Sequence, residues 1–234
     1  MGIAYNSNIV RDGLVLHLDA ANPKSYPGTG TTWYDLSGNG NDGSLVNGVE
    51  YNSNNLGNLI LDGTNDYIIN TSVTSESLGI TTSQEATLEC WMNINIQNRW
   101  TGVFGLMISY GNSVDIGWDI NPTNNVRIWK NTSGAQLTSF NLNDVSGTWC
   151  QFVYTTNNTE GSKFFINGKL MQSYSTHSSI TIPYTPGRYF MFGDHWDRPV
   201  NGNVSDIQIY NRALTEEEIQ QNFEALRGRY GIWV

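Results

Sequence analysis

The sequence predicts an all-β fold, a sandwich of two antiparallel sheets with one short helix near the C-terminus. Short runs of β-branched and aromatic residues recur along the chain, and Gly, Asn, Asp and Ser bound them. Charged residues make up only 14% of the chain, which holds 24 glycines and is rich in asparagine, a composition that favours turns. These runs do not alternate with helical segments, as they would in a parallel sheet. Two packed antiparallel sheets are therefore expected.

The apolar runs define the expected strands. In chain order they cover residues 14–18, 59–61, 67–69, 87–94, 103–108, 114–120, 126–130, 149–155, 163–166, 170–174, 189–192 and 204–210. Asn167 and Gly168 separate two of them. Because both residues tolerate a positive φ, this pair predicts a hairpin with a two-residue type I′ turn.

The segment 215–228 predicts one amphipathic helix. Thr215 is expected to cap it together with Glu218, three residues later, and acidic residues favour the first turn. Ile219, Phe223 and Leu226 fall on one face, which we expect to dock on the sandwich rather than on a partner.

No internal repeat or linker divides the chain, so we expect one domain over residues 1–234, with an N-terminal arm at 1–12. Cys90 and Cys150 lie in expected strands and are expected to be buried apolar residues. A disulfide between them is conceivable if their strands are neighbours, but the sequence does not give their separation.

The net charge is −9 and the 12 Lys and Arg residues are scattered, which disfavours nucleic acid as a partner. No stretch is long and apolar enough for membrane insertion, and the segment from Met1 to Asn6 has no features of an export signal.

The loop of residues 35–43 carries oxygen-bearing side chains at alternate positions between glycines. Calcium prefers clusters of such oxygens. The glutamate that would complete an EF-hand falls at Val46, so an EF-hand is excluded, and Asp206 or Asp66 would have to supply further oxygens. The alternative is that these side chains only stabilise turns through local hydrogen bonds.

Seven segments, in order, resemble a known family. They are GLVLHLD at 13–19, WYDLSGNGNDG at 33–43, LDGTNDYI at 61–68, TLECW at 87–91, TWCQFV at 148–153, FINGKL at 165–170 and GNVSDIQIYNRALTEEEI at 202–219. Together they resemble the laminin-G-like jelly-roll domains of the concanavalin A-like lectin/glucanase superfamily. The resemblance implies a two-sheet jelly roll, frequently with one structural calcium. It points to four ligands: Asp35, Asn39, Asn41 and Asp206.

Residues 13–34 also resemble laminin-G-like proteins of tailed bacteriophages. This resemblance implies a virion structural protein, a capsid decoration or a tail or neck fibre component. The expected partners are other virion proteins in an oligomeric assembly, and the expected location is the virion surface.

Catalysis is not expected, because glycosidases of this superfamily place paired carboxylates on one strand and no Glu-x-Asp-x-x-Glu arrangement occurs. A degenerate glycoside hydrolase is the least favoured alternative. A carbohydrate-binding module or adhesin that recognises host surface glycans is the stronger one. Its candidate residues are Asp194, His195, Trp196, Asp197, Arg198 and Trp100, with rims at 98–100 and 121–125. The competing interpretation is that Trp196 covers one end of the sandwich while Arg198 pairs with Asp194 or Asp197.

Overall fold

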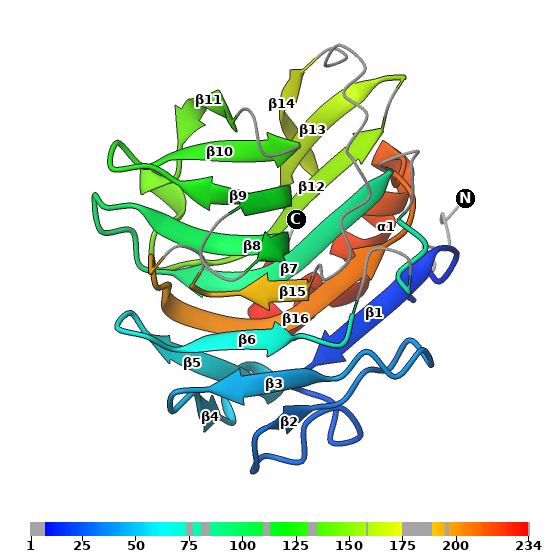
Figure 1. Cartoon of the computed structure of the whole chain (residues 1–234), viewed down its shortest axis with the longest axis vertical. Coiled ribbons are helices and arrows are strands. Elements are labelled where there is room, and N and C mark those ends of the chain that lie inside the picture. The colour runs from blue at the N-terminus through cyan, green and yellow to red at the C-terminus, as the bar shows by residue number, and fades with distance from the viewer. Residues whose placement is uncertain are drawn as a thin grey trace.

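The computed structural model describes residues 8–73, 77–80, 85–109, 113–130, 135–157, 159–174, 189–194 and 197–233. They form two antiparallel sheets that pack face to face, and Figure 1 looks onto the outer face of the front sheet. In spatial order the front sheet contains β11 (Ala135–Asn141), β10 (Asn125–Lys130), β9 (Ser113–Ile120), β8 (Thr101–Ser109), β15 (Tyr189–Phe192), β6 (Tyr67–Asn70), β3 (Gly43–Val46) and β2 (Thr32–Trp33).

The rear sheet contains β14 (Lys169–Tyr174), β13 (Gly161–Ile166), β12 (Trp149–Asn157), β7 (Ala86–Ile94), β16 (Asn201–Tyr210), β5 (Asn58–Asp62) and β4 (Glu50–Asn52), and β1 (Leu14–Asp19) pairs with β16. The helical segments are α1 (Glu216–Leu226) and the 3-10 turns η1 (Asn54–Leu56), η2 (Asn143–Val145) and η3 (Arg227–Tyr230). The all-β prediction is confirmed, and each expected strand is present. β2, β3, β4 and β11 were not expected, because strands that are short or lie at a sheet edge are defined mainly by the strands beside them.

Aromatic side chains fill the space between the sheets. Trp118 and Phe104 of the front sheet and Phe152 and Phe164 of the rear sheet are fully buried. The Trp118 ring meets the Phe164 ring edge-on, with centroids 5.2 Å apart and planes at 76°. Because side chains alternate along a strand, the other side of each sheet is left for surface contacts.

The hairpin expected at Asn167 and Gly168 joins β13 to β14, and Ile166 pairs with Lys169 across it. Both turn residues have positive φ, 52° and 73°, as a type I′ turn requires. The two cysteines are buried and free. They lie on the neighbouring strands β7 and β12, where Cys150 is opposite Met92 and Cys90 is opposite Phe152.

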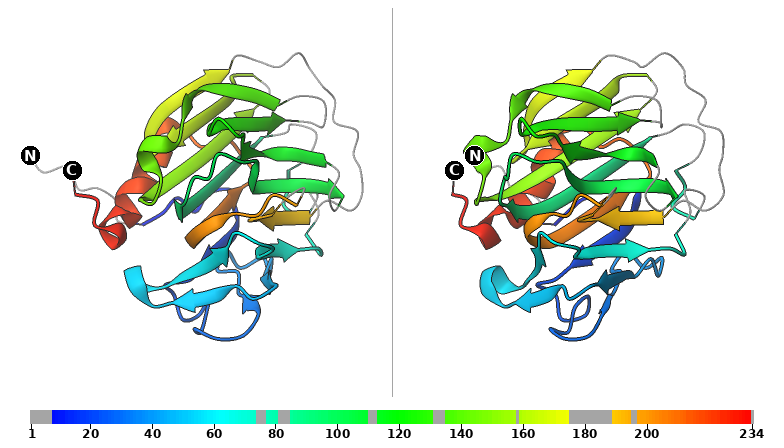
Figure 2. Two further views of the ribbon diagram at one scale, coloured as in Figure 1. Left: turned by 90° about the vertical axis from the view of Figure 1, so that its left-hand side faces the viewer. Right: turned by 60° about the vertical axis from the view of Figure 1, so that its left-hand side comes forward.

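Helix α1 covers the outer face of the rear sheet, as the edge-on view in Figure 2 shows. Thr215 and Glu218 form the expected capping box. Ile219 is buried in a cluster with Val153, and Phe223 is buried against Trp91 of β7, so the apolar stripe docks on the sandwich as expected. Helix α1 lies on the opposite side of the molecule from the outer face of the front sheet.

In the described residues no helix is long and apolar enough to cross a membrane.

Candidate functional site

The loop expected to bind calcium is held by its own hydrogen bonds. One carboxylate oxygen of Asp35 accepts from the backbone N–H groups of His17 and Ser37, both at 2.9 Å. The other accepts from the Ser37 hydroxyl at 2.6 Å and from the Asn41 N–H at 3.0 Å. Four donors therefore surround this carboxylate. The arrangement matches the alternative in which acidic and amide side chains stabilise turns.

The two asparagines of the loop attach it to β1. The side-chain amides of Asn39 and Asn41 donate to the Val15 carbonyl oxygen, at 3.3 and 2.7 Å. Asp66 closes a separate turn by accepting from the Asp62 N–H at 3.0 Å. These contacts do not test the calcium prediction, which stands as a prediction about the ion.

Asp206, the fourth predicted ligand, is buried on β16 and belongs to a different group. Its carboxylate lies 3.0 Å from Nε2 of His17 and accepts from the Gln208 amide at 2.7 Å. Ligand atoms of His17, Asp19 and Asp206 all lie within 4.8 Å of one another. Burial lowers the pKa of His17, but the Asp206 and Asp19 carboxylates together outweigh this effect and the pKa is raised. Arg229 pairs with Asp19 at 2.8 Å, so a cation already balances this carboxylate.

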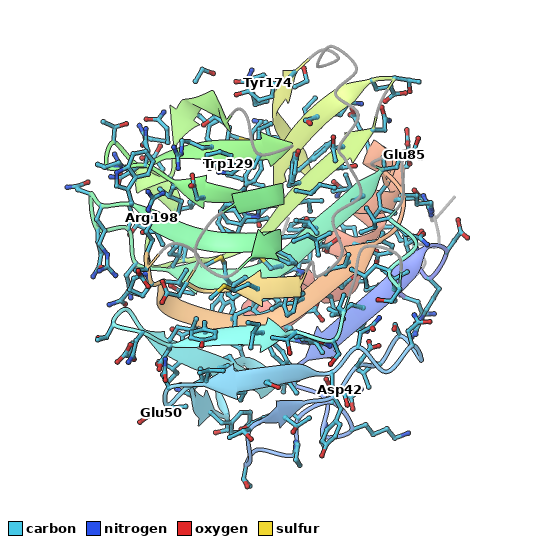
Figure 3. All side chains as sticks on the ribbon, in the orientation of Figure 1. Asp42, Glu50, Glu85, Trp129, Tyr174 and Arg198 are labelled. Atoms are coloured by element: carbon cyan, nitrogen blue, oxygen red, sulfur yellow. The ribbon has the colours of Figure 1, made fainter. Side chains whose placement is uncertain are left out.

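A second group of polar and aromatic residues lies at one end of the front sheet. We name it the Trp100 patch and define it by five residues: Trp100, Asp119, Arg127, Trp129 and Arg198. Trp100 immediately precedes β8, Asp119 is on β9, Arg127 and Trp129 are on β10, and Arg198 lies between β15 and β16. Figure 3 labels Trp129 over β10 and Arg198 near the left-hand edge of the same sheet.

Strand alternation places the β10 residues on the outer face. Val126 and Ile128 are buried in the core, and Arg127 and Trp129, which alternate with them, therefore point outward. Asp119 is the cross-strand partner of Arg127. Its buried carboxylate accepts from Nε of Arg127 at 2.7 Å and from Nη2 of the same guanidinium. The register of β9 and β10 thus determines where this guanidinium lies.

Cation–π contacts connect the two tryptophans through this arginine. The Arg127 guanidinium carbon lies 3.9 Å from the ring centroid of Trp100 and 4.8 Å from that of Trp129. Arg198 approaches Trp100 at 4.7 Å and reaches within 3.6 Å of an Asp119 oxygen. Such contacts contribute about 0.5–1 kcal/mol each at exposed sites. They fix the orientation of Trp100, which is nevertheless 37% exposed.

Glycines on β8 and β9 make room for the Trp129 side chain. Trp129 is opposite Gly117, Gly117 is opposite Gly105, and Gly105 is opposite Met191. Because no side chain rises from the two glycines, the indole of Trp129 can lie across both strands and pack against Met191, beside Tyr67 and Ile69. The result is a half-buried aromatic surface on the outer face of the sheet.

The patch brings together two of the predicted glycan-binding residues, Trp100 and Arg198. Asp194 is 8% exposed; burial raises its pKa to about 6, while a hydrogen bond from the Arg198 backbone lowers it. Asp197 is exposed, and its φ is 54°. His195 and Trp196 lie outside the described residues. The Arg198 guanidinium lies 3.6 Å from a carboxylate oxygen of Asp119 on β9, a partner that the sequence did not predict.

The two expected rims are joined to each other. The side-chain amide of Asn124 donates to Asn98 at 2.5 Å and to Asn143 at 2.7 Å. Arg99 donates to the carbonyl oxygens of Gly63 and Pro199, at 2.9 and 3.0 Å. The loops around Trp100 are therefore anchored on both sides.

A comparison with protein families identifies the superfamily of this chain. The Laminin_G_3 model, described as the concanavalin A-like lectin/glucanases superfamily, matches residues 62–220. The chain belongs to this superfamily. A search of curated proteins gave no match. The superfamily assignment agrees with the two antiparallel sheets and with the resemblance found in the sequence.

Solved structures share the concanavalin A-like fold at low sequence identity. Trypanosoma rangeli sialidase in complex with sialic acid has a TM-score of 0.68 and 16% identity, over 93% of this chain and 33% of the sialidase chain. Botulinum neurotoxin type C, whose cell entry depends on interaction with two ganglioside molecules, has a TM-score of 0.71 and 17% identity, over 93% of this chain and 52% of the toxin chain. The botulinum neurotoxin DC binding domain in complex with rat synaptotagmin II has a TM-score of 0.70 and 18% identity, over 93% and 52% of the two chains.

This member of the superfamily thus spans about a third of the sialidase chain and about half of the toxin chains. At these identities the likeness shows the fold alone. The residues that could bind a ligand come from the geometry of this chain.

Proposed function

We propose that the chain is a carbohydrate-binding domain and that the Trp100 patch is its binding site. The observation that carries this proposal is the pair of outward-facing tryptophans, Trp100 and Trp129, which Arg127 holds in place on the outer face of the front sheet. Sugar rings present apolar C–H faces to aromatic side chains and hydroxyl groups to polar ones. The patch offers indole surface beside guanidinium donors. The sialic acid complex of one structural neighbour and the ganglioside interaction of another add support.

We propose binding without hydrolysis. A glycosidase uses one carboxyl group as an acid and a second as a nucleophile or base, separated by about 5–9.5 Å. Asp119, the carboxylate of the patch, is fully buried and accepts hydrogen bonds from Arg127. A carboxylate paired with a guanidinium stays ionised and is a poor proton donor, which disfavours an acid role for Asp119. No reducing-sugar release from the glycans that bind is the expected result, and measurable release would overturn the non-catalytic part of the proposal.

The test of binding is a glycan array followed by titration of the strongest ligand. Replacing Trp100 by alanine should weaken binding at least tenfold, because the substitution removes indole surface and frees the Arg127 side chain. Trp233 is the matched control, since it is 80% exposed and follows η3 outside the patch. Trp233→Ala should bind like the unmodified protein. Failure of the unmodified protein on a broad array, or unchanged binding by Trp100→Ala, would refute the proposal.

A virion structural or adhesion role is the second candidate, and the resemblance of residues 13–34 to phage laminin-G-like proteins favours it. In this setting the carbohydrate-binding face would point away from the particle while other surfaces contact virion proteins. Mass spectrometry of purified particles from the source of this gene tests the idea. Absence of this chain from the particles would reject the virion role, and it would not bear on carbohydrate binding.

A further inference from the structure

We propose that the Trp100 patch prefers acidic sugars, and that Arg198 binds the sugar carboxylate. This inference rests on carbohydrate binding at the patch and adds the chemical class of the ligand. The relevant observations are the sign and the placement of charge around Trp100. They are independent of the aromatic surface that supports carbohydrate binding itself.

Positive charge gathers at the patch although the chain is acidic. The protein has a net charge of −9 and only 12 Lys and Arg residues, yet Arg127 and Arg198 both lie against the ring of Trp100. One carboxylate, Asp119, lies between these two guanidiniums. The three groups together carry a charge of +1. A third arginine, Arg99, precedes Trp100 and donates to two backbone carbonyl oxygens.

The two guanidiniums differ in how Asp119 holds them. Arg127 makes a two-point contact through Nε and Nη2, and its side chain is 18% exposed. Arg198 reaches the same carboxylate at 3.6 Å, a distance for an ion pair rather than a hydrogen bond, and its side chain is 28% exposed. Arg127 therefore positions the patch, and Arg198, whose side chain is the more exposed of the two, is the cation better placed to meet a ligand.

A guanidinium presents planar, paired N–H donors that match the two oxygens of a carboxylate. Trp100 is 37% exposed beside Arg198, so a sugar ring can contact the indole while its carboxylate meets the arginine. Of the two described acidic residues that flank Arg198 in the chain, Asp194 is buried and Asp197 is exposed. Charge-assisted hydrogen bonds of this kind change affinity about tenfold or more.

The test uses the unmodified protein and pairs of ligands that differ only in the acidic group. Sialyllactose is titrated against its methyl ester, and trigalacturonic acid against its methyl ester, which distinguishes sialic acids from uronic acids as the source of the carboxylate. The acid should bind at least tenfold more tightly than its ester in at least one pair. This comparison needs no mutant and does not depend on how well a variant folds.

Variants then assign the carboxylate contact. Arg198→Gln should lower affinity for the preferred acid about tenfold while its affinity for the methyl ester stays within twofold. Arg198→Lys should restore part of the loss, because charge returns without the planar fork. Lys169→Gln, which removes an exposed lysine at the start of β14, is the matched control and should have no effect.

The binding measurements distinguish a failure of the preference for acidic sugars from a failure of carbohydrate binding itself. Equal binding of acids and esters, or of neutral and acidic array glycans, would overturn the acidic-sugar inference and leave carbohydrate binding intact. Preference for sulfated over carboxylated sugars would also overturn it. Absence of binding to any glycan would refute both proposals together.

Discussion

Arg229 fastens the C-terminal turn η3 to the first strand, and replacing it with methionine should lower the free energy of unfolding by about 3–5 kcal/mol. Its guanidinium makes two hydrogen bonds to the Asp19 carboxylate, at 2.8 and 3.1 Å. The side chains of Arg229 and Asp19 are only 14% and 10% exposed. Methionine keeps much of the side-chain volume but leaves the buried Asp19 carboxylate without this cation.

The magnitude follows from what remains around Asp19. Its cross-strand neighbour on β16 is Asp206, a second buried carboxylate, which pairs with His17. Breaking a buried pair by removing one partner costs about 3–5 kcal/mol, because the other charge is left in a poorly solvated site. For a chain of this size each kcal/mol shifts the melting temperature by about 2–4 °C. Arg229→Met should therefore melt about 6–20 °C lower.

The assay is urea unfolding monitored by tryptophan fluorescence, with thermal melting as a second measurement. Lys163→Met is the control, because Lys163 pairs with exposed Glu160 and Glu216 and should cost at most about 1 kcal/mol. Adding Asp19→Asn to Arg229→Met removes the uncompensated charge and should recover part of the loss. Equal costs for Arg229→Met and Lys163→Met, or a double mutant no more stable than Arg229→Met, would refute this reasoning.

Three further predictions concern other parts of the fold. Burial raises the pKa of Glu89 to about 7, although hydrogen bonds from Asn222 and Gln151 lower it. Because the pKa is raised, protonation of the Glu89 carboxylate stabilises the folded state. This contribution to the free energy of unfolding is complete below about pH 4.5, and the whole of it, about 3 kcal/mol, is lost as the pH rises through 7. Glu89→Gln should flatten this decline in urea titrations between pH 4.5 and 8, and an unchanged slope would contradict the assignment. If the loop of residues 35–43 binds calcium, a 100-fold excess over its Kd should stabilise the protein by about 2.7 kcal/mol; identical melting in calcium and in chelator, with no metal by elemental analysis, would reject that site. Thr215→Ala removes the helix cap and should cost about 1 kcal/mol by chemical denaturation, and no measurable loss would show that docking alone holds α1.

Features governed by neighbouring residues were predictable from the sequence. The Asn167–Gly168 hairpin and the Thr215–Glu218 capping box both formed, because turn and cap preferences act over a few residues. The apolar runs located the longer strands for the same reason. The short strand β3 was not predicted, since its pairing with β2 and β6 depends on residues elsewhere in the chain.

The candidate site was only half visible in the sequence. The sequence-based prediction of a glycan site includes Trp100 and Arg198 but not Asp119, Arg127 or Trp129. Alternation along β10 could have shown that Arg127 and Trp129 point outward, as their neighbours are core residues. It could not have shown that Asp119 pairs with Arg127, because that depends on the register between β9 and β10.

The sequence by itself determined the all-β fold, the hairpin and the capped helix, because these depend on local preferences and on the periodicity of apolar residues. Only the tertiary structure decided where charge and aromatic surface meet. It placed Asp35 in a closed network of turn hydrogen bonds and Asp206 beside His17. It also gathered Trp100, Arg127 and Arg198 from three separate segments. Contacts of this kind depend on strand register and on the packing of loops at the end of a sheet. The local sequence around each residue therefore does not predict them.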